Sequence, residues 1–353
     1  MTKIDKTTGQ GPAAIVLASD PILEVFRPPL PDTSHLPEGL REDVEASFEY
    51  LDRNIADSTK KSYEKAWQRF VAWARQYGHP ALPAAPEVVI TYASHLARTG
   101  KTYSTICVAI SAIGSAHDAR NIEPNPIRSI KVKKARRGIA RAIGTHQIPK
   151  KDLTPAELRR MLDVLPDGLL GMRDRALLLL WYNCASRRSE PTSLNIEDVR
   201  FAEDGMFVLF LKTKTDQEGK GQDKAVPYSS GVRQCPVRAV KAWINEMSKH
   251  GHSSGPLFRA VRGPWIGNDA MTPRAAVDRI KRYGKLAGFT EAEMAKISGH
   301  SLRSGFATAA SRRGRSAESI MAQTGHKSMT NLMKYIRAGR MMRDSAAVGI
   351  LDE

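Results

Sequence analysis

Cysteine is scarce in this chain, and Cys107, Cys184 and Cys235 lie far apart with no CxxC pair. That spacing excludes a disulfide framework and a cysteine-based zinc site, and it fits a reducing compartment. Long apolar runs are also missing, since none approaches the roughly 20 consecutive residues that cross a bilayer. The first residues lack the basic and apolar regions of a secretory signal. We therefore expect a cytoplasmic protein with no membrane partner.

Acidic residues are few relative to basic ones. The chain has 54 Lys and Arg against 37 Asp and Glu, which gives a net charge of +17 and an isoelectric point near 9.9. Such an excess is typical of a protein that handles a polyanion, and nucleic acid is the first candidate. The 353 residues include 41% hydrophobic ones, so the chain is globular and long enough for two domains.

The N-terminal part divides into an arm and a helical domain. Residues 1–39 hold six of the 20 prolines, and we interpret them as a flexible arm. From residue 40 the pattern becomes helical, with Tyr63, Trp67 and Phe70 on one face of the first clear amphipathic stretch. Further helical patterns follow, so residues 40–127 predict a small all-helical domain.

A basic stretch follows at residues 128–151. It contains nine Lys or Arg residues and no Asp or Glu. We interpret it as an interdomain linker, and its position in a basic protein favours contact with DNA phosphates over a merely solvated connector. The candidate DNA-binding residues are Lys131, Lys133, Lys134, Arg136, Arg137 and Arg141.

Residues 152–353 predict a second, mainly helical domain. Thr154 to Glu157 forms a capping box with proline at the first helical position. Residues 172–185 form a strongly apolar helix, while 205–211 and 224–228 are typical of two strands around a polar turn. Helical patterns then return at about 233–249, 272–287, 300–313, 316–324, 329–337 and 340–350. The predicted fold class is mainly α with a small antiparallel β-sheet.

Two motifs near the C-terminus carry a chemical signal. His300 and Arg303 lie three residues apart, so both side chains could reach one phosphate from a single helical face. His326 follows Gly325 and precedes Tyr335 by nine residues. Tyrosine is a weak nucleophile because its phenol pKa is about 10, so it needs cations and a base nearby. The two histidines and the arginine could supply both, although such a motif in isolation is more often structural.

Two upstream segments add further basic groups. Arg187 follows the apolar helix and could clamp phosphate oxygens, with Glu190 three residues later to hold it. Arg188 is the alternative for the same role. Lys214 lies in the polar turn between the two strands, where a mobile lysine could reach DNA and act as a general acid. Lys212 competes with it.

In order and spacing these residues resemble the signature of the tyrosine recombinases, the phage integrase family. The set comprises Arg187, Lys214, His300, Arg303, His326 and Tyr335. The tail from Ile320 to Arg337 is similar to that of the Cre-like members of the family. The resemblance covers about residues 40–353 and leaves the arm outside. It implies an enzyme, a tyrosine site-specific recombinase with a core-binding domain followed by a catalytic domain.

The resemblance also implies a role for each residue. Tyr335 would attack the scissile phosphate and leave a 3′-phosphotyrosyl link and a free 5′-hydroxyl. Arg187, Arg303 and His326 would act as preorganised cations on the non-bridging oxygens. Lys214 would protonate the leaving oxygen, His300 would be a base or proton relay, and Glu190 would support Arg187. Neither a metal nor another cofactor is required.

The resemblance implies partners as well. The substrate would be a double-stranded DNA site with inverted arms, bound by monomers or dimers that form a homotetramer on two sites. Strands would exchange through a Holliday junction, with a C-terminal helix near residues 340–350 docked on a neighbouring protomer. Accessory proteins and a nucleoid location in a bacterial or phage context are compatible with this reading. Integration, excision and resolution remain equal outcomes.

Two alternatives belong to other functional classes. A type IB topoisomerase-like enzyme would use similar chemistry to relax DNA as a monomer. A catalytically silent protein would only bind a specific DNA site. Formation of a covalent adduct through Tyr335 distinguishes an enzyme from a pure binder.

Overall fold

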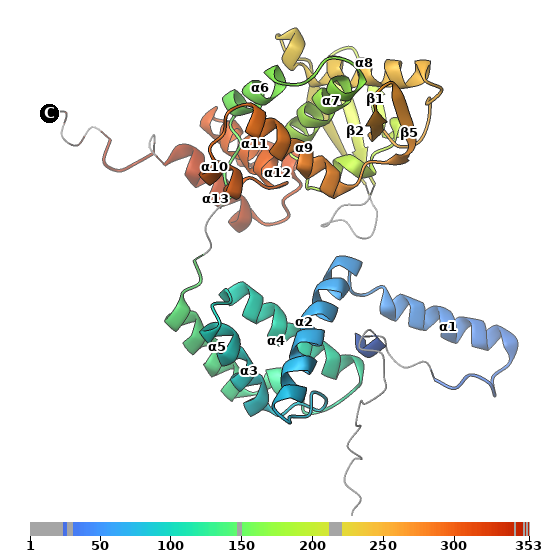
Figure 1. The fold of residues 1–353 in the computed structure, drawn as a ribbon, viewed down its shortest axis with the longest axis vertical. Helices are drawn as coiled ribbons and strands as arrows, with labels where there is room; N and C mark the ends of the chain where they lie inside the picture. The colour runs from blue at the N-terminus through green and yellow to red at the C-terminus, as the bar shows by residue number, and fades with distance from the viewer. Residues whose placement is uncertain are drawn as a thin grey trace, which may run out of the picture. The chain divides into compact units, whose positions relative to one another are not determined.

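The computed structural model describes residues 24–26, 31–146, 150–211, 221–341, 344–348, 350 and 352 (Figure 1). It separates into two compact units, Met1–Gln147 and Ile148–Glu353. Each unit has its own buried apolar core. Helices dominate both units, and the second also contains small antiparallel sheets, so the predicted fold class is confirmed.

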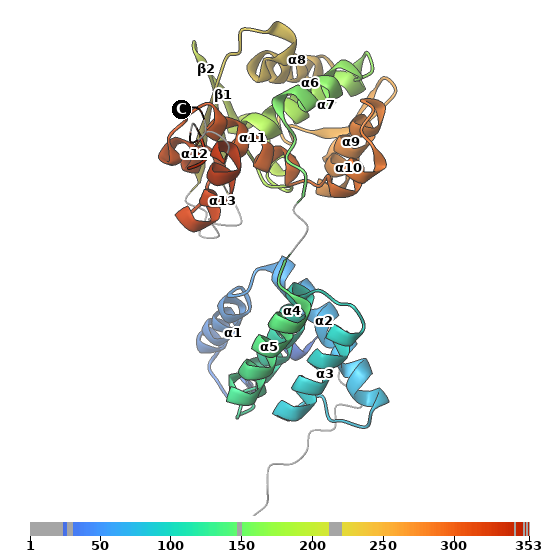
Figure 2. The same ribbon diagram turned by 90° about the vertical axis from the view of Figure 1, so that its left-hand side faces the viewer.

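The first unit is all helical in its described part. Its elements are η1 (Glu24–Phe26), α1 (Glu38–Asp52), α2 (Asp57–Gln76), α3 (Pro86–Arg98), α4 (Tyr103–Ala119), η2 (Pro126–Arg128) and α5 (Ile130–Ile143). Helix α2 packs on α4, and α3 packs on α5 (Figure 2). The apolar stripe expected from the sequence faces this core, where Trp67 and Phe70 are 2% and 0% exposed.

The structure changes the expected role of one part of the arm. Val25 and Phe26, within the proposed 1–39 arm, are buried in the first core. The ring centroids of Phe26 and Trp67 lie 6.4 Å apart. Burial of these two apolar side chains anchors η1 to the bundle, which the proline-rich composition around it concealed.

The prediction of an interdomain linker at 128–151 is wrong over most of this segment. Residues Ile130–Ile143 form α5, capped by the Ser129 hydroxyl, which accepts a hydrogen bond from the Lys131 amide. Val132 is 3% exposed and packs into the first core. The basic residues therefore occupy the outer face of a packed helix, whose inner face docks on the core through buried Val132 and partly buried Ile139.

The second unit surrounds helix α7. Its helices are α6 (Pro155–Asp163), α7 (Leu169–Asn183), α8 (Pro236–Lys249), α9 (Pro273–Leu286), α10 (Glu291–Lys296), α11 (Ser301–Arg312), α12 (Ala317–Thr324) and α13 (Met329–Arg340). The short 3₁₀ helices are η3 (Pro191–Ser193), η4 (Ile196–Asp198) and η5 (Val232–Gln234). Helix α7 carries an unbroken apolar run from Ala176 to Tyr182, and ten of its 15 residues are buried, so it forms the centre of the core.

Two antiparallel sheets complete this unit. The first has the order β1 (Val199–Phe201), β2 (Gly205–Phe210) and β3 (Gln222–Pro227), with Met206 paired to Val226. The second pairs β4 (Arg259–Arg262) with β5 (Trp265–Ala270). The sequence predicted β2 and β3 but neither the β4–β5 hairpin nor α10, because these elements are short and carry polar residues.

The end of the chain also differs from expectation. Helix α13 continues to Arg340, and the described residues beyond it, 341, 344–348, 350 and 352, contain no helix. The predicted helix at 340–350 is therefore wrong in the described residues, since Gly349 and the Asp344-Ser345 pair do not favour a helix. Across the ranges that the structure describes, no helix has the length and apolar character to cross a bilayer.

Candidate active site

Tyr335 and His300 face each other across two helices of the second unit. Helix α13 packs against α11 and buries Leu332 and Ile336. Tyr335, the residue before Ile336, is half-buried. His300 directly precedes α11, and its Nε2 lies 2.7 Å from the Tyr335 hydroxyl oxygen. Burial raises the pKa of Tyr335, an effect that the Arg303 charge opposes. The phenol is therefore protonated at neutral pH and needs a base.

His300 is suited to accept that proton. Partial removal of its ring from water lowers the His300 pKa, and the charges of Arg303 and Arg187 lower it further. A neutral imidazole has one ring nitrogen with a free lone pair. A phenol hydrogen directed at Nε2 requires the His300 hydrogen to lie on Nδ1, and this is the tautomer that can accept the proton of Tyr335.

Arg187 lies in a turn that follows α7. Its Nη1 donates to Glu190 Oε1 at 2.9 Å, and its backbone N–H donates to Glu190 Oε2 at 2.8 Å. Glu190 is 3% exposed, whereas the Arg187 side chain is 20% exposed and Arg188 is exposed. The buried carboxylate thus orients Arg187 and leaves part of its guanidinium accessible. Arg187 Nη2 also lies 3.5 Å from the Gly325 carbonyl oxygen.

Arg303 is buried within the same cluster. It is 1% exposed, and its Nη1 donates to the Ala185 carbonyl at 2.9 Å. Its Nε has no hydrogen-bond partner among the described residues. Burial, followed by the Arg187 charge, lowers the pKa of Arg303 to about 10, so the group remains a cation at neutral pH. A buried arginine beside a partly exposed one favours an anion at the accessible side of the pair.

His326 enters the cluster from the end of α12. Thr324 Oγ1 donates its hydrogen to the Ile320 carbonyl at 2.6 Å, so it accepts from His326 Nδ1 at 2.7 Å. Burial and the charges of Arg303 and Arg187 lower the pKa of His326 to about 4. His326 is therefore neutral at pH 7 in the DNA-free chain. The ring centroids of His326 and Tyr335 lie 5.8 Å apart.

Two predicted lysines lie outside the described residues, namely Lys212 and Lys214. The structure places another lysine at the cluster that sequence reasoning missed. Lys224 on β3 is 2% exposed, and its Nζ donates to the Cys184 carbonyl at 2.8 Å. Burial lowers its pKa to about 8. Strand alternation offered a signal, because Lys224 shares its face with the inward-facing Val226.

The basic residues of α5 belong to the first unit. All six predicted DNA-binding side chains are exposed: Lys131, Lys133, Lys134, Arg136, Arg137 and Arg141. Lys131 Nζ lies 2.7 Å from Glu87 Oε1 of α3, in an exposed ion pair. Within the described parts of the chain, no three His, Cys, Asp or Glu side chains are placed to hold a metal ion.

Comparison with known proteins gives consistent matches. The family model described as "Phage integrase family" matches residues 151–340. An integrase/recombinase described as a XerD homologue from Selenomonas ruminantium is 34% identical over 300 residues, covering 84% of this chain and 86% of the relative. Tyrosine recombinase XerC from Vibrio vulnificus is 25% identical over 308 residues, covering 85% of this chain and 88% of the relative.

Solved structures share the fold. XerH recombinase bound to a palindromic difH substrate superposes with a TM-score of 0.66 at 16% identity, covering 94% of this chain and 95% of that one. A lambda integrase tetramer bound to a Holliday junction gives a TM-score of 0.56 at 14% identity, covering 85% and 78%. These matches support the resemblance of the tail to the Cre-like members only loosely.

The matched family region contains the whole cluster around Tyr335. The family model spans more than half of the chain, and the XerD homologue covers most of it. The chain therefore belongs to the phage integrase family and is a tyrosine site-specific recombinase.

Proposed function

We propose that Tyr335 is the nucleophile of this recombinase and His300 its base. The 2.7 Å contact between the Tyr335 hydroxyl and His300 Nε2 carries the proposal. As the phenol oxygen attacks the scissile phosphorus, its proton moves to His300. The phosphorus–O5′ bond breaks, leaving a 3′-phosphotyrosyl link and a 5′-oxygen that takes a proton from a lysine in the β2–β3 turn, Lys214 or Lys212. The bond energy is conserved for rejoining.

The two arginines supply the charge that this step needs. Negative charge grows on the non-bridging oxygens in the transition state, and preorganised donors stabilise it at no reorganisation cost. Arg187, held by Glu190, and Arg303, held by the Ala185 carbonyl, are placed for this task. His326 is neutral before DNA binds. The negative charge of a bound phosphate raises the His326 pKa, so that the protonated ring becomes a third hydrogen-bond donor.

The first unit contributes DNA contacts through α5. Its six exposed basic residues line the outer face of one helix, where lysine and arginine neutralise backbone phosphates. Such contacts fix position on the duplex and carry no sequence information. The substrate is a duplex site with inverted arms, because identical protomers bind a two-fold site in symmetric pairs.

The assembled enzyme is a homotetramer on two sites, and strand exchange proceeds through a Holliday junction. Support for this comes from the related lambda integrase, whose tetramer is seen on such a junction. The chain segment beyond α13 docks on a neighbouring copy. Met341, Val348 and Ile350 in this segment are 67%, 64% and 66% exposed, which leaves apolar area for a partner to cover.

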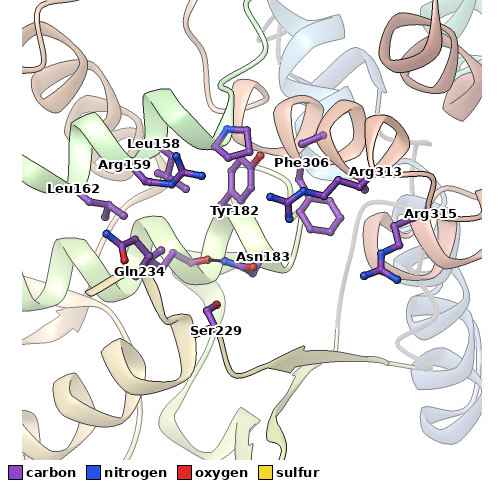
Figure 3. Close-up of a pocket in the computed structure, with 14 residues that line it drawn as sticks. Leu158, Arg159, Leu162, Tyr182, Asn183, Ser229, Gln234, Phe306, Arg313 and Arg315 are labelled. Carbon is purple, nitrogen blue, oxygen red and sulfur yellow. Dashed lines mark hydrogen bonds between the residues drawn. The ribbon is translucent and has the colours of Figure 1, made fainter. Parts of the chain in front are cut away.

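A cavity on the second unit suits that segment. It has a volume of about 260 Å³ and lies between α6, α7 and α11 (Figure 3). Apolar side chains and arginines line it, among them Leu158, Tyr182, Phe306, Arg159, Arg313 and Arg315. The segment beyond α13 is complementary to this lining, because the apolar Val348 and Ile350 match its apolar side chains and the acidic Asp352 matches its arginines.

The experiment that tests the chemistry isolates covalent adducts. Purified protein is incubated with DNA of its source replicon, denatured rapidly, and the protein-linked DNA ends are sequenced. We expect 3′-linked adducts clustered at a short pair of inverted arms. The Tyr335→Phe variant should bind the same sites and form none, while Tyr228→Phe, an exposed tyrosine of the same unit, should react as the wild type does.

Other results point to the alternatives. Adducts scattered without sequence preference favour a topoisomerase-like enzyme, and absence of adducts on bound, nicked sites favours a silent binder. Truncation after Arg340 tests docking separately. It should abolish the tetramer and leave single-site binding intact, and Arg313→Glu should weaken the tetramer in the same assay. Loss of site binding together with the tetramer would contradict the docking role.

A further inference from the structure

The turn between α7 and Arg187 is held in an unusual way. Four consecutive backbone carbonyls each accept a hydrogen bond from a side chain. The pairs are Asn183 O with Gln323 Nε2 at 2.6 Å, Cys184 O with Lys224 Nζ at 2.8 Å, Ala185 O with Arg303 Nη1 at 2.9 Å, and Ser186 O with Trp181 Nε1 at 2.9 Å. The donors come from α12, β3, α11 and α7, so four elements fix one turn.

The turn needs this support because its backbone is strained. Ala185 has a φ of 47°, in the left-handed region that side-chain-bearing residues seldom adopt. Such conformations cost free energy and persist only where the surroundings over-determine them. Arg187 lies two residues after Ala185, and the Ala185 carbonyl accepts the hydrogen bond from Arg303. The position of both arginines therefore depends on the shape of this turn.

Lys224 is a costly donor to bury, because it carries a charge and is 2% exposed. Its Nζ lies 4.7 Å from the centroid of the Phe210 ring, and the side chain is directed at a backbone carbonyl. An ammonium group in such a site loses hydration that one carbonyl and one ring replace only in part. An apolar residue would pack on this inward face of β3 at lower cost. The lysine is thus placed for a purpose other than packing.

Gln323 links the same turn to the end of α12, which precedes His326. Its Nε2 also lies 3.3 Å from the Ala225 carbonyl of β3, and Gln222 Nε2 donates to the Ala322 carbonyl at 2.6 Å. Strand β3 and the end of α12 are therefore hydrogen-bonded to each other and to the turn. Gly325 and His326 follow directly after this junction.

We propose that Lys224, together with Gln323, is a positioning residue of the recombinase reaction, fixing the turn that presents Arg187 and anchors Arg303. The inference rests on the proposed function and deepens it. Lys224 acts through the Cys184 carbonyl and is distinct from the lysine that protonates the leaving oxygen. Without its donor, that carbonyl relaxes toward other partners and both guanidinium groups shift from the phosphate.

The test compares two leaving groups in single-turnover cleavage of a nicked site. One substrate carries oxygen and the other sulfur at the 5′-bridging position. A thiol has a pKa near 8.5, so a sulfur leaving group departs without a proton donor. Lys224→Met should cleave both substrates on the order of 10- to 100-fold more slowly than the wild type, because misplacing a catalytic group by about 1 Å has that effect. Site binding should stay within about twofold.

Lys241→Met is the matched control, because Lys241 Nζ lies 5.8 Å from the Phe201 ring on an exposed face. It should cleave at the wild-type rate. A coupling experiment adds a second readout: in an Arg187→Lys background, Lys224→Met should slow cleavage far less than in the wild type. Circular dichroism checks folding, and if Lys224→Met does not fold, Gln323→Leu replaces it, with a defect of the same kind on both substrates.

Three results would overturn the inference. Wild-type cleavage by the lysine variant, or by Gln323→Leu, removes the positioning role. Recovery on the sulfur substrate alone makes Lys224 the proton donor instead. Fully additive effects with Arg187→Lys show that Lys224 does not act through Arg187. Failure of the proposed function gives a different result, because the wild type then forms no covalent adduct. That result would also contradict the inference, since the inference depends on the proposed function.

Discussion

Replacing Glu190 with glutamine removes the negative charge that balances the basic cluster. Its carboxylate accepts two hydrogen bonds from Arg187 and is 3% exposed. The same charge raises the pKa of both Arg303 and Lys224, as expected if it stabilises their protonated forms. The Glu190→Gln variant keeps the shape and an acceptor oxygen, so charge is the main quantity that changes.

The cost to stability follows from burial. Removing one partner of a fully buried ion pair destabilises a protein by about 3–5 kcal/mol. Arg187 retains 20% side-chain exposure, and glutamine keeps one hydrogen bond, so we expect roughly 2–3 kcal/mol. A domain of this size loses about 2–4 °C of Tm per kcal/mol, which predicts a drop of roughly 5–10 °C.

Calorimetry of the DNA-free protein at pH 7 measures this drop. Glu246→Gln is the control, because Glu246 pairs with Lys249, which is 71% exposed, and loss of such a surface pair costs at most about 1 kcal/mol. An oxyanion such as vanadate should raise the Tm of Glu190→Gln more than that of the wild type, since it supplies the missing charge. A variant that melts within about 2 °C of the wild type, or an equal anion effect in both proteins, refutes the reasoning.

Three further predictions concern the stability of the second unit. Asp174→Ala leaves the buried Arg173 guanidinium without its 2.6 Å partner and should cost about 3–5 kcal/mol by urea unfolding. Gly305→Ala places a Cβ in steric overlap with the Leu153 carbonyl oxygen, so it should destabilise by about 1–3 kcal/mol in the same assay. The neutral form of His326 is favoured by folding, because its pKa falls from 6.5 to about 4. Stability should therefore decline as pH falls from 6.5 towards 4, and His326→Asn should flatten that part of the curve.

Much of the second unit was predictable because local patterns agree with the tertiary structure. The capping box at Thr154, the apolar run of α7 and the alternation of β2 each encode one element through its own residues. The chemical cluster was predictable for a different reason. Residues far apart in sequence kept an order and spacing that resemble a known family, although no local rule brings Arg187 to Tyr335.

Predictions failed where burial overruled composition. Basic charge made 128–151 look like a linker, yet Val132 docks α5 on the first core. Prolines made 1–39 look like an arm throughout, yet Phe26 is buried. At the other end, apolar residues near 340–350 suggested a helix that the described residues do not form. In each case the presence or absence of a few buried apolar contacts decided the structure, and the amino-acid composition of the segment did not.

The charge, the helical and strand patterns and the residue types needed for phosphoryl transfer by a tyrosine can all be read along the chain. The protonation states of these residues and the hydrogen bonds that hold them arise only in the folded protein. Folding made His326 neutral by removing it from water beside two arginines, and it placed Lys224 under the Cys184 carbonyl. Such properties depend on burial and on neighbours distant in sequence, and neither quantity is set by the residues immediately along the chain.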